Sequence, residues 1–309
     1  MILCMGETLI DFIPAETRDG VPAYRPAVGG SPGNVALTLA RLDVPAGFVG
    51  GVSTDFFGEE IFATLAKNGV AMDYVPRLDR PTMLAFVDLK ADEPRYAFFD
   101  NGAAARHWRL EDMPPIADGV NALHFGSLSL IRKPAASAFA ALMSRERTGR
   151  TISFDPNIRA GLVEDEADYR ARLEEFLRSA HVIKLSGADL DWIAPGEEPE
   201  RFAARRLGEE ARLVLFTRGS EGASLFSRSG ASVSRLARNI EVVDTVGAGD
   251  SMMGGLLAAL FDRNALERSA IERLSETDLA GILDFALAVA AVTCSRVGAD
   301  PPRRAELGL

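Results

Sequence analysis

The sequence predicts an α/β fold built on a mainly parallel β-sheet. Short apolar runs alternate with longer segments in which apolar residues recur every three or four positions, a pattern typical of strands followed by helices. No internal repeat, low-complexity tract or polar linker divides the 309 residues, which are enough for one large core. We therefore expect one domain over 1–309.

The expected strands are short and rich in apolar and β-branched residues. They cover 2–5, 47–51, 122–125, 151–154, 182–185, 213–217, 223–226 and 239–243. The expected helices cover 32–42, 57–68, 134–147, 168–178, 187–193, 200–207, 249–261 and 278–295. The helix at 32–42 has a clear start, because Ser31 is a good N-cap and Pro32 suits the first helical position.

Two segments, 12–28 and 82–99, break this alternation, because each looks like hairpin material without an intervening helix. In the second, the runs 82–89 and 94–99 flank Lys90-Ala91-Asp92-Glu93, which is a plausible turn. Such insertions could pair into a small sheet that acts as a lid over a ligand crevice. An extension of the main sheet with no moving part is the alternative.

The composition argues against several classes of function. The net charge is −10, from 44 acidic and 34 basic residues, and no Lys- or Arg-rich run offsets it. We therefore expect no nucleic-acid partner and no membrane partner. The N-terminus does not resemble a signal peptide, and we expect no apolar run long enough to span a bilayer. The two cysteines, Cys4 and Cys294, suggest no disulfide framework, so we expect a cytoplasmic location.

The most informative motif is Asp244-Thr245-Val246-Gly247-Ala248-Gly249-Asp250-Ser251, between the expected strand at 239–243 and the helix at 249–261. A strand, a Gly-x-Gly turn and a helix start place backbone N–H groups and the positive end of the helix dipole around one anion site. Asp250 adds a carboxylate there, which suggests a catalytic base. On these residues alone, a tight turn with Asp250 as a helix cap explains the motif equally well.

A second glycine cluster, Gly29-Gly30-Ser31-Pro32-Gly33-Asn34, opens another helix. Glycines let a ligand approach the backbone, and Asn34 offers both a donor and an acceptor. Asp11 follows the first strand, where open α/β sheets bind ligands, although a turn or capping role is the alternative. A carboxylate, an amide and bare backbone together suit the hydroxyl groups of a sugar.

Polar residues also follow later strands: Arg159 after 151–154, Lys184 and Ser186 at the end of 182–185, and Thr217 at the end of 213–217. The carboxyl ends of parallel strands meet at one edge of a sheet, so we expect these side chains to converge. No Walker-type P-loop, no G-x-G-x-x-G after the first strand and no G-x-S-x-G elbow occurs. These absences argue against a P-loop enzyme, a dinucleotide-binding dehydrogenase and a hydrolase.

The two glycine motifs resemble the two signatures of the ribokinase-like (PfkB-type) carbohydrate kinases. Segments 5–11 and 154–159 and the run Thr217-Arg218-Gly219 also match that family in order, so the resemblance covers essentially the whole chain. Segments 30–36 and 154–159 are most similar to the bacterial fructokinase branch. The resemblance implies a three-layer α/β/α sandwich with a small β-sheet lid.

The resemblance also implies roles for single residues. Asp250 would be the catalytic base, with the N–H groups of Gly247, Ala248 and Gly249 binding the transferred phosphoryl group. The co-substrate would be ATP with Mg²⁺, and the helix at 278–295 with Gly298 would border the adenine. The implied sugar-binding residues are Asp11, Gly29, Gly30, Asn34 and Arg159. The implied nucleotide-binding residues are Lys184, Ser186, Thr217, Gly219, Gly222 and Gly249.

The metal assignments implied by the resemblance are less direct. Where much of the family has Asn-x-x-Glu, this chain has Ser186-Gly187-Ala188-Asp189, so Asp189 would hold Mg²⁺ through water. Asp244 and the carbonyl of Val246 match positions that bind a monovalent cation, such as K⁺, in some members.

The expected reaction is phosphorylation of a primary hydroxyl of a small sugar, most of all fructose. A 2-keto-3-deoxygluconate kinase is an alternative, because Arg159 could meet the carboxylate of an acid sugar. A ribokinase or nucleoside kinase is another, and a non-catalytic sugar-binding regulator is the alternative from a different class. The lid could also form a homodimer contact.

Overall fold

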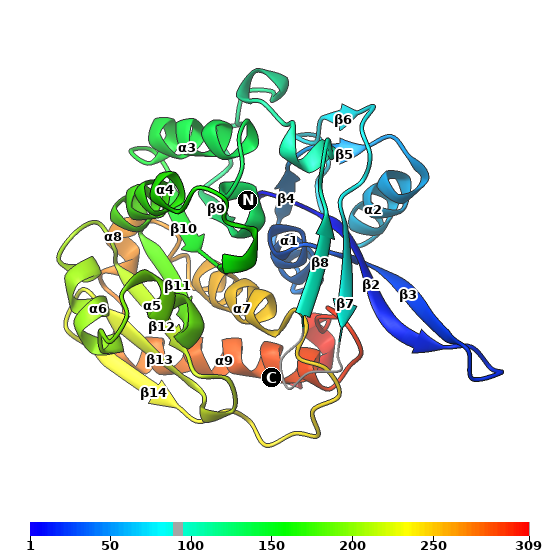
Figure 1. Ribbon diagram of the computed structural model, residues 1–309. Coiled ribbons are helices and arrows are strands. Elements are labelled where there is room, and N and C mark those ends of the chain that lie inside the picture. Colours follow the sequence, from blue (N-terminus) through cyan, green and yellow to red (C-terminus); the bar gives the residue numbers. More distant parts are fainter. Residues whose placement is uncertain (89–94, 309) are drawn as a thin grey trace.

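The computed structural model describes residues 1–88 and 95–308. Within these ranges, eight strands form the main sheet in the order β14-β13-β12-β11-β10-β9-β1-β4 (Figure 1). All neighbours from β4 to β12 are parallel, whereas β13 runs antiparallel to β12 and β14. The strands are β1 (Ile2–Met5), β4 (Ala46–Val49), β9 (Ala122–Gly126), β10 (Thr151–Asp155), β11 (Val182–Ser186), β12 (Leu213–Thr217), β13 (Ala223–Ser227) and β14 (Ser232–Arg235).

Helices cover both faces of this sheet, which gives three layers (Figure 1). Successive side chains of a strand point to opposite faces. Accordingly, Ile2 and Cys4 of β1 lie in one buried cluster, and Leu3 and Met5 lie in the other. The helices are α1 (Ser31–Arg41), α2 (Phe56–Lys67), α3 (Ala135–Glu146), α4 (Glu166–Ser179), α5 (Gly187–Ile193), α6 (Pro199–Leu207), α7 (Ala248–Asp262), α8 (Arg268–Ile271) and α9 (Glu276–Cys294).

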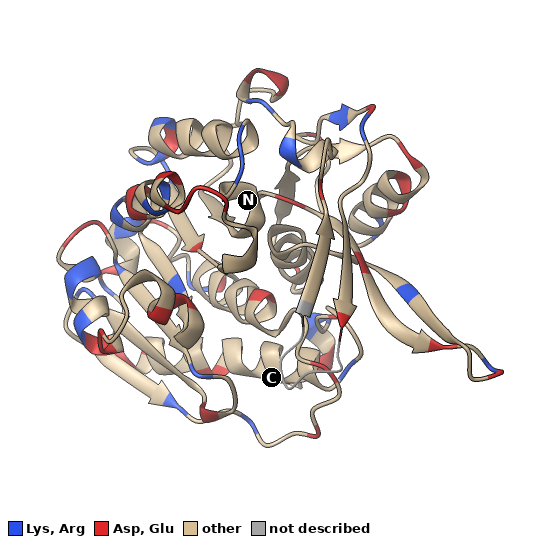
Figure 2. Cartoon of the chain, in the orientation of Figure 1, with Lys and Arg blue, Asp and Glu red and all other residues tan. Residues whose placement is uncertain are grey.

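Charged side chains lie on the outer helices and also on loops and on strands of the smaller sheets (Figure 2). In Figure 2, basic and acidic residues are interspersed along α4 and α6. Several of them pair, as Arg170 does with Glu166 at 2.7 Å and Arg206 with Glu174 at 2.6 Å. These pairs leave α4 and α6 without a face of a single sign of charge.

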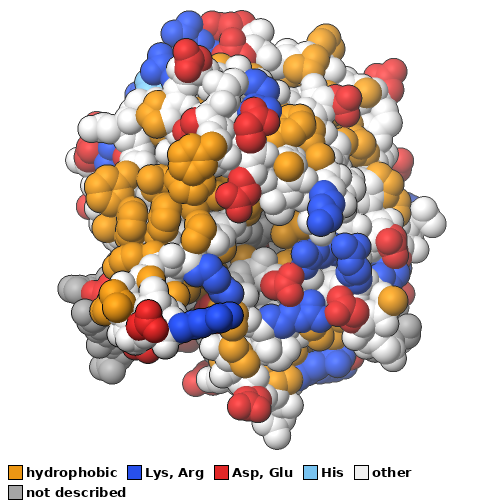
Figure 3. Space-filling model, turned by 90° about the vertical axis from the view of Figure 1, so that its right-hand side faces the viewer, with side chains coloured by type: hydrophobic (Ala, Val, Ile, Leu, Met, Phe, Trp, Pro, Cys, Tyr) orange, Lys and Arg blue, Asp and Glu red, His pale blue; other side chains and the backbone are white. Residues whose placement is uncertain are grey.

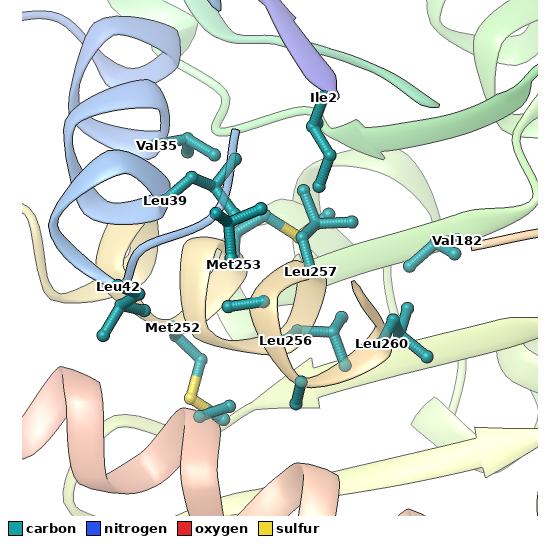
Figure 4. Packing of buried hydrophobic residues seen from close by; sticks show 14 of the residues in the cluster. Ile2, Val35, Leu39, Leu42, Val182, Met252, Met253, Leu256, Leu257 and Leu260 are labelled. Carbon is teal, nitrogen blue, oxygen red and sulfur yellow. The ribbon is translucent and has the colours of Figure 1, made fainter. Parts of the chain in front are cut away.

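The contact between α1 and α7 forms the centre of one core. Figure 4 shows Val35 and Leu39 of α1 facing Met253 and Leu257 of α7, and all four side chains are fully buried. Gly254 permits this approach, because a Cβ at that position would lie 2.6 Å from Cγ2 of Thr38. The packing thus fixes α1 against α7 along their length.

Replacing Gly254 with Ala should therefore lower the free energy of unfolding. We expect a loss of about 1–3 kcal/mol from overpacking, although Ala is favoured over Gly inside a helix by about 1 kcal/mol. Equilibrium unfolding in urea measures the change. Gly187→Ala in α5 is the matched control, since a Cβ there meets nothing within 4 Å. Equal stability of Gly254→Ala and the parent protein would contradict the steric explanation.

A separate small sheet forms from β2 (Leu9–Glu16), β3 (Pro22–Gly29), β7 (Leu84–Asp88) and β8 (Arg95–Phe99), in the order β3-β2-β7-β8. It lies to one side of the main sheet in Figure 1, as the two predicted hairpin segments imply. The predicted turn Lys90-Ala91-Asp92-Glu93 lies outside the described residues. Two further strands, β5 (Val52–Ser53) and β6 (Arg77–Leu78), pair with each other.

The strand expected at 239–243 does not form. These residues run as irregular chain, and the backbone N–H of Val243 donates to the carbonyl of Cys294 at 2.8 Å. Val242 and Val243 are more than half exposed, so their β-branched side chains do not enter the sheet. The edge of the sheet is instead formed by the hairpin β13–β14, and β14 was missed because Ser232-Val233-Ser234-Arg235 has little strand character. The short helix α8 was also missed.

One helix corrects the expectation about membrane-spanning segments. In the described part of the chain, α9 has 19 residues and a mean hydropathy of 1.7, which is long and apolar enough to cross a membrane. In the structure this helix packs against α7, β13 and β14, with Leu279, Ile282 and Leu283 fully buried. Part of its apolar composition therefore belongs to this packed face, since 39% of the apolar window is buried.

Candidate active site

The turn predicted at the start of α7 is present, although no strand precedes it. Gly247 is the N-cap residue and has a left-handed backbone with φ of 74°. A Cβ at Gly247 would lie 2.6 Å from Cβ of Ala299, so a side chain is excluded. The carboxylate of Asp244 braces the turn by accepting from the N–H of Val246 at 3.0 Å and of Gly298 at 2.8 Å.

Asp250 lies in the first turn of α7 and is nearly buried, with 7% of its surface exposed. Its Oδ1 accepts a hydrogen bond from Ser31 Oγ at 2.6 Å, and its Oδ2 accepts one from Asn34 Nδ2 at 2.8 Å. The two glycine motifs therefore meet directly. The prediction that Ser31 caps α1 is wrong, because Gly30 is the N-cap residue and the Ser31 hydroxyl is engaged with Asp250 instead.

Two cavities meet at this turn. The smaller has a volume of about 180 Å³, and its wall includes Asp11, Gly30, Asn34 and Asp250. The larger has a volume of about 540 Å³, and its wall includes Thr217, Gly219, Gly222 and Ala248. Thr245 and Gly249 line both cavities. The start of α7 thus separates two spaces that a sugar and a nucleotide could fill.

Asp11 reaches the smaller cavity from β2 of the small sheet. Gly29 on the paired strand β3 leaves room for it, since a Cβ there would lie 2.0 Å from Asp11 Oδ2. Burial and the charge of Asp250 raise the pKa of Asp11 to about 7, although Arg159 acts in the opposite direction. Near neutral pH this carboxyl therefore exists in both protonation states when the cavity holds no ligand.

The raised pKa of Asp11 should make the free energy of unfolding depend on pH. The carboxyl of Asp11 titrates near 3.8 when unfolded and about 7 when folded, so its ionisation opposes folding as the pH rises through that window. We expect Asp11→Asn to gain stability relative to the parent protein between about pH 4 and pH 7, with little further gain above about pH 8. Urea unfolding of both proteins across this range tests the sign, and a difference that does not change with pH would contradict it.

Arg159 lines the smaller cavity, and one nitrogen of its guanidinium is engaged with neighbouring groups. Its guanidinium donates to Asn157 Oδ1 at 2.7 Å and lies 5.9 Å from the ring centroid of Tyr96. Tyr96 belongs to β8, so this contact joins the small sheet to the main fold. The arrangement presents Arg159 beside Asp11, with part of its hydrogen-bonding capacity already used.

Lys184 in the middle of β11 and Asp155 at the end of the adjacent strand β10 form a buried ion pair. Lys184 Nζ donates to Asp155 Oδ2 at 2.6 Å, and their side chains are 5% and 1% exposed. Burial lowers the pKa of Lys184, but the charges of Asp155, Asp189 and Asp250 and the hydrogen bond to Asp155 together outweigh it, so the pKa is raised and the ammonium stays charged. Lys184 lines the smaller cavity, with Nζ 3.4 Å from the position that a Cβ on Gly249 would take.

Ser186 and Asp189 do not reach the cavities. The Asp189 carboxylate accepts hydrogen bonds from Ser186 N, Ser186 Oγ and Ile158 N, and the pair forms a capping box at the start of α5. Neither is among the described residues that line the two cavities, and the nucleotide contact of Ser186 stays a prediction. The described residues also contain no cluster of three or more His, Cys, Asp or Glu side chains that could hold a metal.

The larger cavity has an apolar wall that the sequence identified only in part. The helix expected to border the adenine lines it as α9, whereas Gly298 instead donates to Asp244. The irregular chain before α7 also lines it. This contribution was not expected, because residues 239–243 were predicted to form a strand of the sheet. The cavity residues that the sequence analysis missed include Ala237, Asn239, Ile240, Val242 and Met252.

One aromatic residue of the smaller cavity, Tyr96, was also missed. Tyr96 and Phe98 lie two positions apart on β8 and line the wall formed by the small sheet. Residues at i and i+2 of a strand share a face, so the period-two pattern could have identified Tyr96. Asn157 was missed as well, although it lies within the segment 154–159.

Residues 1–305 match the family described as pfkB family carbohydrate kinase. A fructokinase from Rhizobium leguminosarum bv. trifolii is 39% identical over 281 residues, which are 90% of this chain and 85% of that protein.

Two solved structures have the same fold. The fructokinase from Xylella fastidiosa with bound ATP has a TM-score of 0.90 and 29% identity, covering 99% of this chain and 97% of that one. The fructokinase from Vibrio cholerae O395 with fructose, ADP and calcium bound has a TM-score of 0.86 and 26% identity, covering 99% and 97%.

Proposed function

Because this chain belongs to the PfkB family of carbohydrate kinases and is therefore a sugar kinase, we propose that it transfers the γ-phosphoryl group of ATP to a primary hydroxyl of fructose. The observation that carries the proposal is the position of Asp250 in the wall of the small polar cavity, next to Gly249, which also lines the larger apolar one. Fructose would occupy the smaller cavity and ATP the larger. The fructokinase relatives support this choice of substrates.

In the proposed mechanism, Asp250 accepts the proton of the attacking hydroxyl as the new P–O bond forms. A positioned base typically contributes about 10²–10⁴-fold to the rate. The N–H groups of Gly247, Ala248 and Gly249 at the start of α7 would stabilise the negative charge on the transferred phosphoryl group. The ammonium of Lys184 would add positive charge beside Gly249. Phosphoryl transfer depends mainly on such positioning and charge stabilisation.

Fructose is favoured over an acid sugar by the charges around the smaller cavity. Asp11, Asp250 and Glu7 all line it. The two cations of its wall are already engaged: Lys184 pairs with Asp155, and Arg159 donates to Asn157 and faces the charge of Asp11. A carboxylate ligand would therefore meet repulsion that a neutral sugar avoids. Asp11, Gly30 and Asn34 would bind the hydroxyls of the neutral sugar.

Mg²⁺ would accompany ATP and reduce the charge on its phosphates. The phosphates and water would be its main ligands, which is common for this ion. Asp189 would act only through water, because it lines neither of the two cavities. A monovalent cation such as K⁺ would bind at Asp244 and the carbonyl of Val246, beside the turn that this carboxylate braces.

A coupled assay of ADP release tests the proposal. The substrates to compare are fructose, ribose, 2-keto-3-deoxygluconate and inosine, each with ATP and Mg²⁺. The highest kcat/KM is expected with fructose. A clear preference for 2-keto-3-deoxygluconate, ribose or inosine would reassign the substrate within the family. No turnover of any of them, with retained sugar binding, would favour a non-catalytic binding protein.

We also propose that the small sheet closes over the sugar as a lid and that its outer face forms a homodimer contact. Phe12 and Phe86 stack there at 4.6 Å between ring centroids, and Tyr24 and Phe99 are more than half exposed. Figure 3 shows hydrophobic side chains gathered on the side of the molecule where the small sheet and α2 lie.

A cytoplasmic location, without nucleic-acid or membrane partners, is in line with the two unpaired cysteines and the acidic net charge.

The dimer has a direct test. Light scattering should give a mass near twice 33.2 kDa for the parent protein and a monomer mass for the double variant Tyr24→Ser/Phe99→Ser. Leu236→Ser is the matched control, since Leu236 is 82% exposed but follows β14 at the far edge of the main sheet. A parent protein that is monomeric at every concentration would overturn this part of the proposal.

A further inference from the structure

We propose that Ser31 is a positioning residue for the base Asp250. Its hydroxyl donates to Asp250 Oδ1 at 2.6 Å, across 219 positions of sequence. Both groups are buried, with 6% of Ser31 and 7% of Asp250 exposed. The inference rests on the proposed function, because it assigns a role to Ser31 through the base of that reaction.

The Ser31 hydroxyl has no local role that would explain its position. A serine at a helix start usually accepts from backbone N–H groups of the first turn. In α1 the N-cap residue is Gly30, and the helix start has no side-chain capping bond. The hydroxyl is instead directed to the first turn of α7, where Asp250 lies.

The two carboxylate oxygens of Asp250 are held by two different side chains of α1. Ser31 donates to Oδ1, and Asn34, one turn later, donates to Oδ2 at 2.8 Å. Two donors on the two oxygens fix the plane of the carboxylate as well as its position. Asp250, Ser31 and Asn34 all line the smaller cavity, so this plane decides how the remaining lone pairs meet a hydroxyl there.

The hydrogen bond is not needed to hold α1 against α7. That contact is already secured by the buried apolar side chains in Figure 4 and by the fit of Thr38 against Gly254. The loss of one hydrogen bond at the end of this interface should leave the helices in place. It should instead release the carboxylate to rotate about its own bonds, and a base that is misplaced slows the chemical step.

The test is a comparison of Ser31→Ala with Ser31→Thr, measured as ADP release with saturating ATP. We expect Ser31→Ala to lower kcat about ten- to a hundredfold with little change in the KM for fructose. Ser31→Thr keeps a hydroxyl and should recover most of the rate. Thr38→Val is the matched control, because it removes another buried hydroxyl of α1 that donates only to the carbonyl of Asn34. Its kcat should equal that of the parent protein.

An unchanged kcat in Ser31→Ala would overturn the proposal. A Ser31→Thr enzyme as slow as Ser31→Ala, or an equal loss in Thr38→Val, would do the same, because either result indicates lost packing. Crystal structures of the parent protein and Ser31→Ala supply a readout that needs no turnover. A carboxylate that keeps its orientation without Ser31 would overturn the proposal, and a rotated one would support it. Absence of turnover in the parent protein would instead contradict the proposed function.

Discussion

Asp250→Asn should lower kcat by about 10²–10⁴-fold, the contribution typical of a positioned general base. The amide keeps the shape of the carboxylate but cannot accept the proton of the attacking hydroxyl at a useful rate. The KM for fructose should stay within a few-fold, because Asp11, Gly30 and Asn34 would still bind the sugar. Steady-state ADP release with varied fructose separates the two parameters.

The other end of the same helix provides the control for this result. Asp262 closes α7 and pairs with Arg304 at 2.9 Å on the surface, away from both cavities. Asp262→Asn should leave kcat unchanged. If Asp250→Asn kept more than about a tenth of the parental kcat, Asp250 would not be the base.

Lys184→Met should lower the free energy of unfolding by about 3–5 kcal/mol, because it leaves the carboxylate of Asp155 buried without its partner. Asp155 is 1% exposed, so water cannot replace the lost ammonium without local opening of the structure. Urea unfolding, monitored by fluorescence and by circular dichroism, measures the loss.

Two further variants separate an unpaired charge from lost packing. Lys184→Met combined with Asp155→Leu removes both charges and should recover most of the stability. Arg235→Met breaks the exposed pair with Asp284 and should cost about 0–1 kcal/mol. A double variant as unstable as Lys184→Met alone would show that the buried charge is not the cause.

The elements of the main sheet could be predicted because their signals are local. The strands β1 and β12 and the helix α5 have the expected bounds, since each is an apolar run or a periodic segment between clear stops. The turn at Gly247–Asp250 could be predicted for the same reason, because its glycines and its acidic residue are adjacent in sequence. The roles of these residues still depend on the proposed reaction.

The remaining features depend on which segments meet in space. Residues 239–243 have strand-like side chains, but the edge position in the sheet belongs to the hairpin β13–β14. Ser31 has the sequence context of a helix cap, yet its hydroxyl donates to Asp250 of α7. Lys184 forms an ion pair with Asp155 on the neighbouring strand. No local pattern carries such pairings, because they arise only when the sheet assembles.

The two cavities have walls from different parts of the fold, so the affinities for the two proposed substrates can change independently. The wall of the smaller cavity is shared between the main fold and the small sheet, through Asp11, Tyr96 and Phe98, whereas the described wall of the larger cavity comes from the main fold alone. Damage to the small sheet should therefore abolish recognition of the sugar while the nucleotide still binds. Binding of the sugar can therefore be altered by changing residues of the small sheet that do not line the nucleotide cavity.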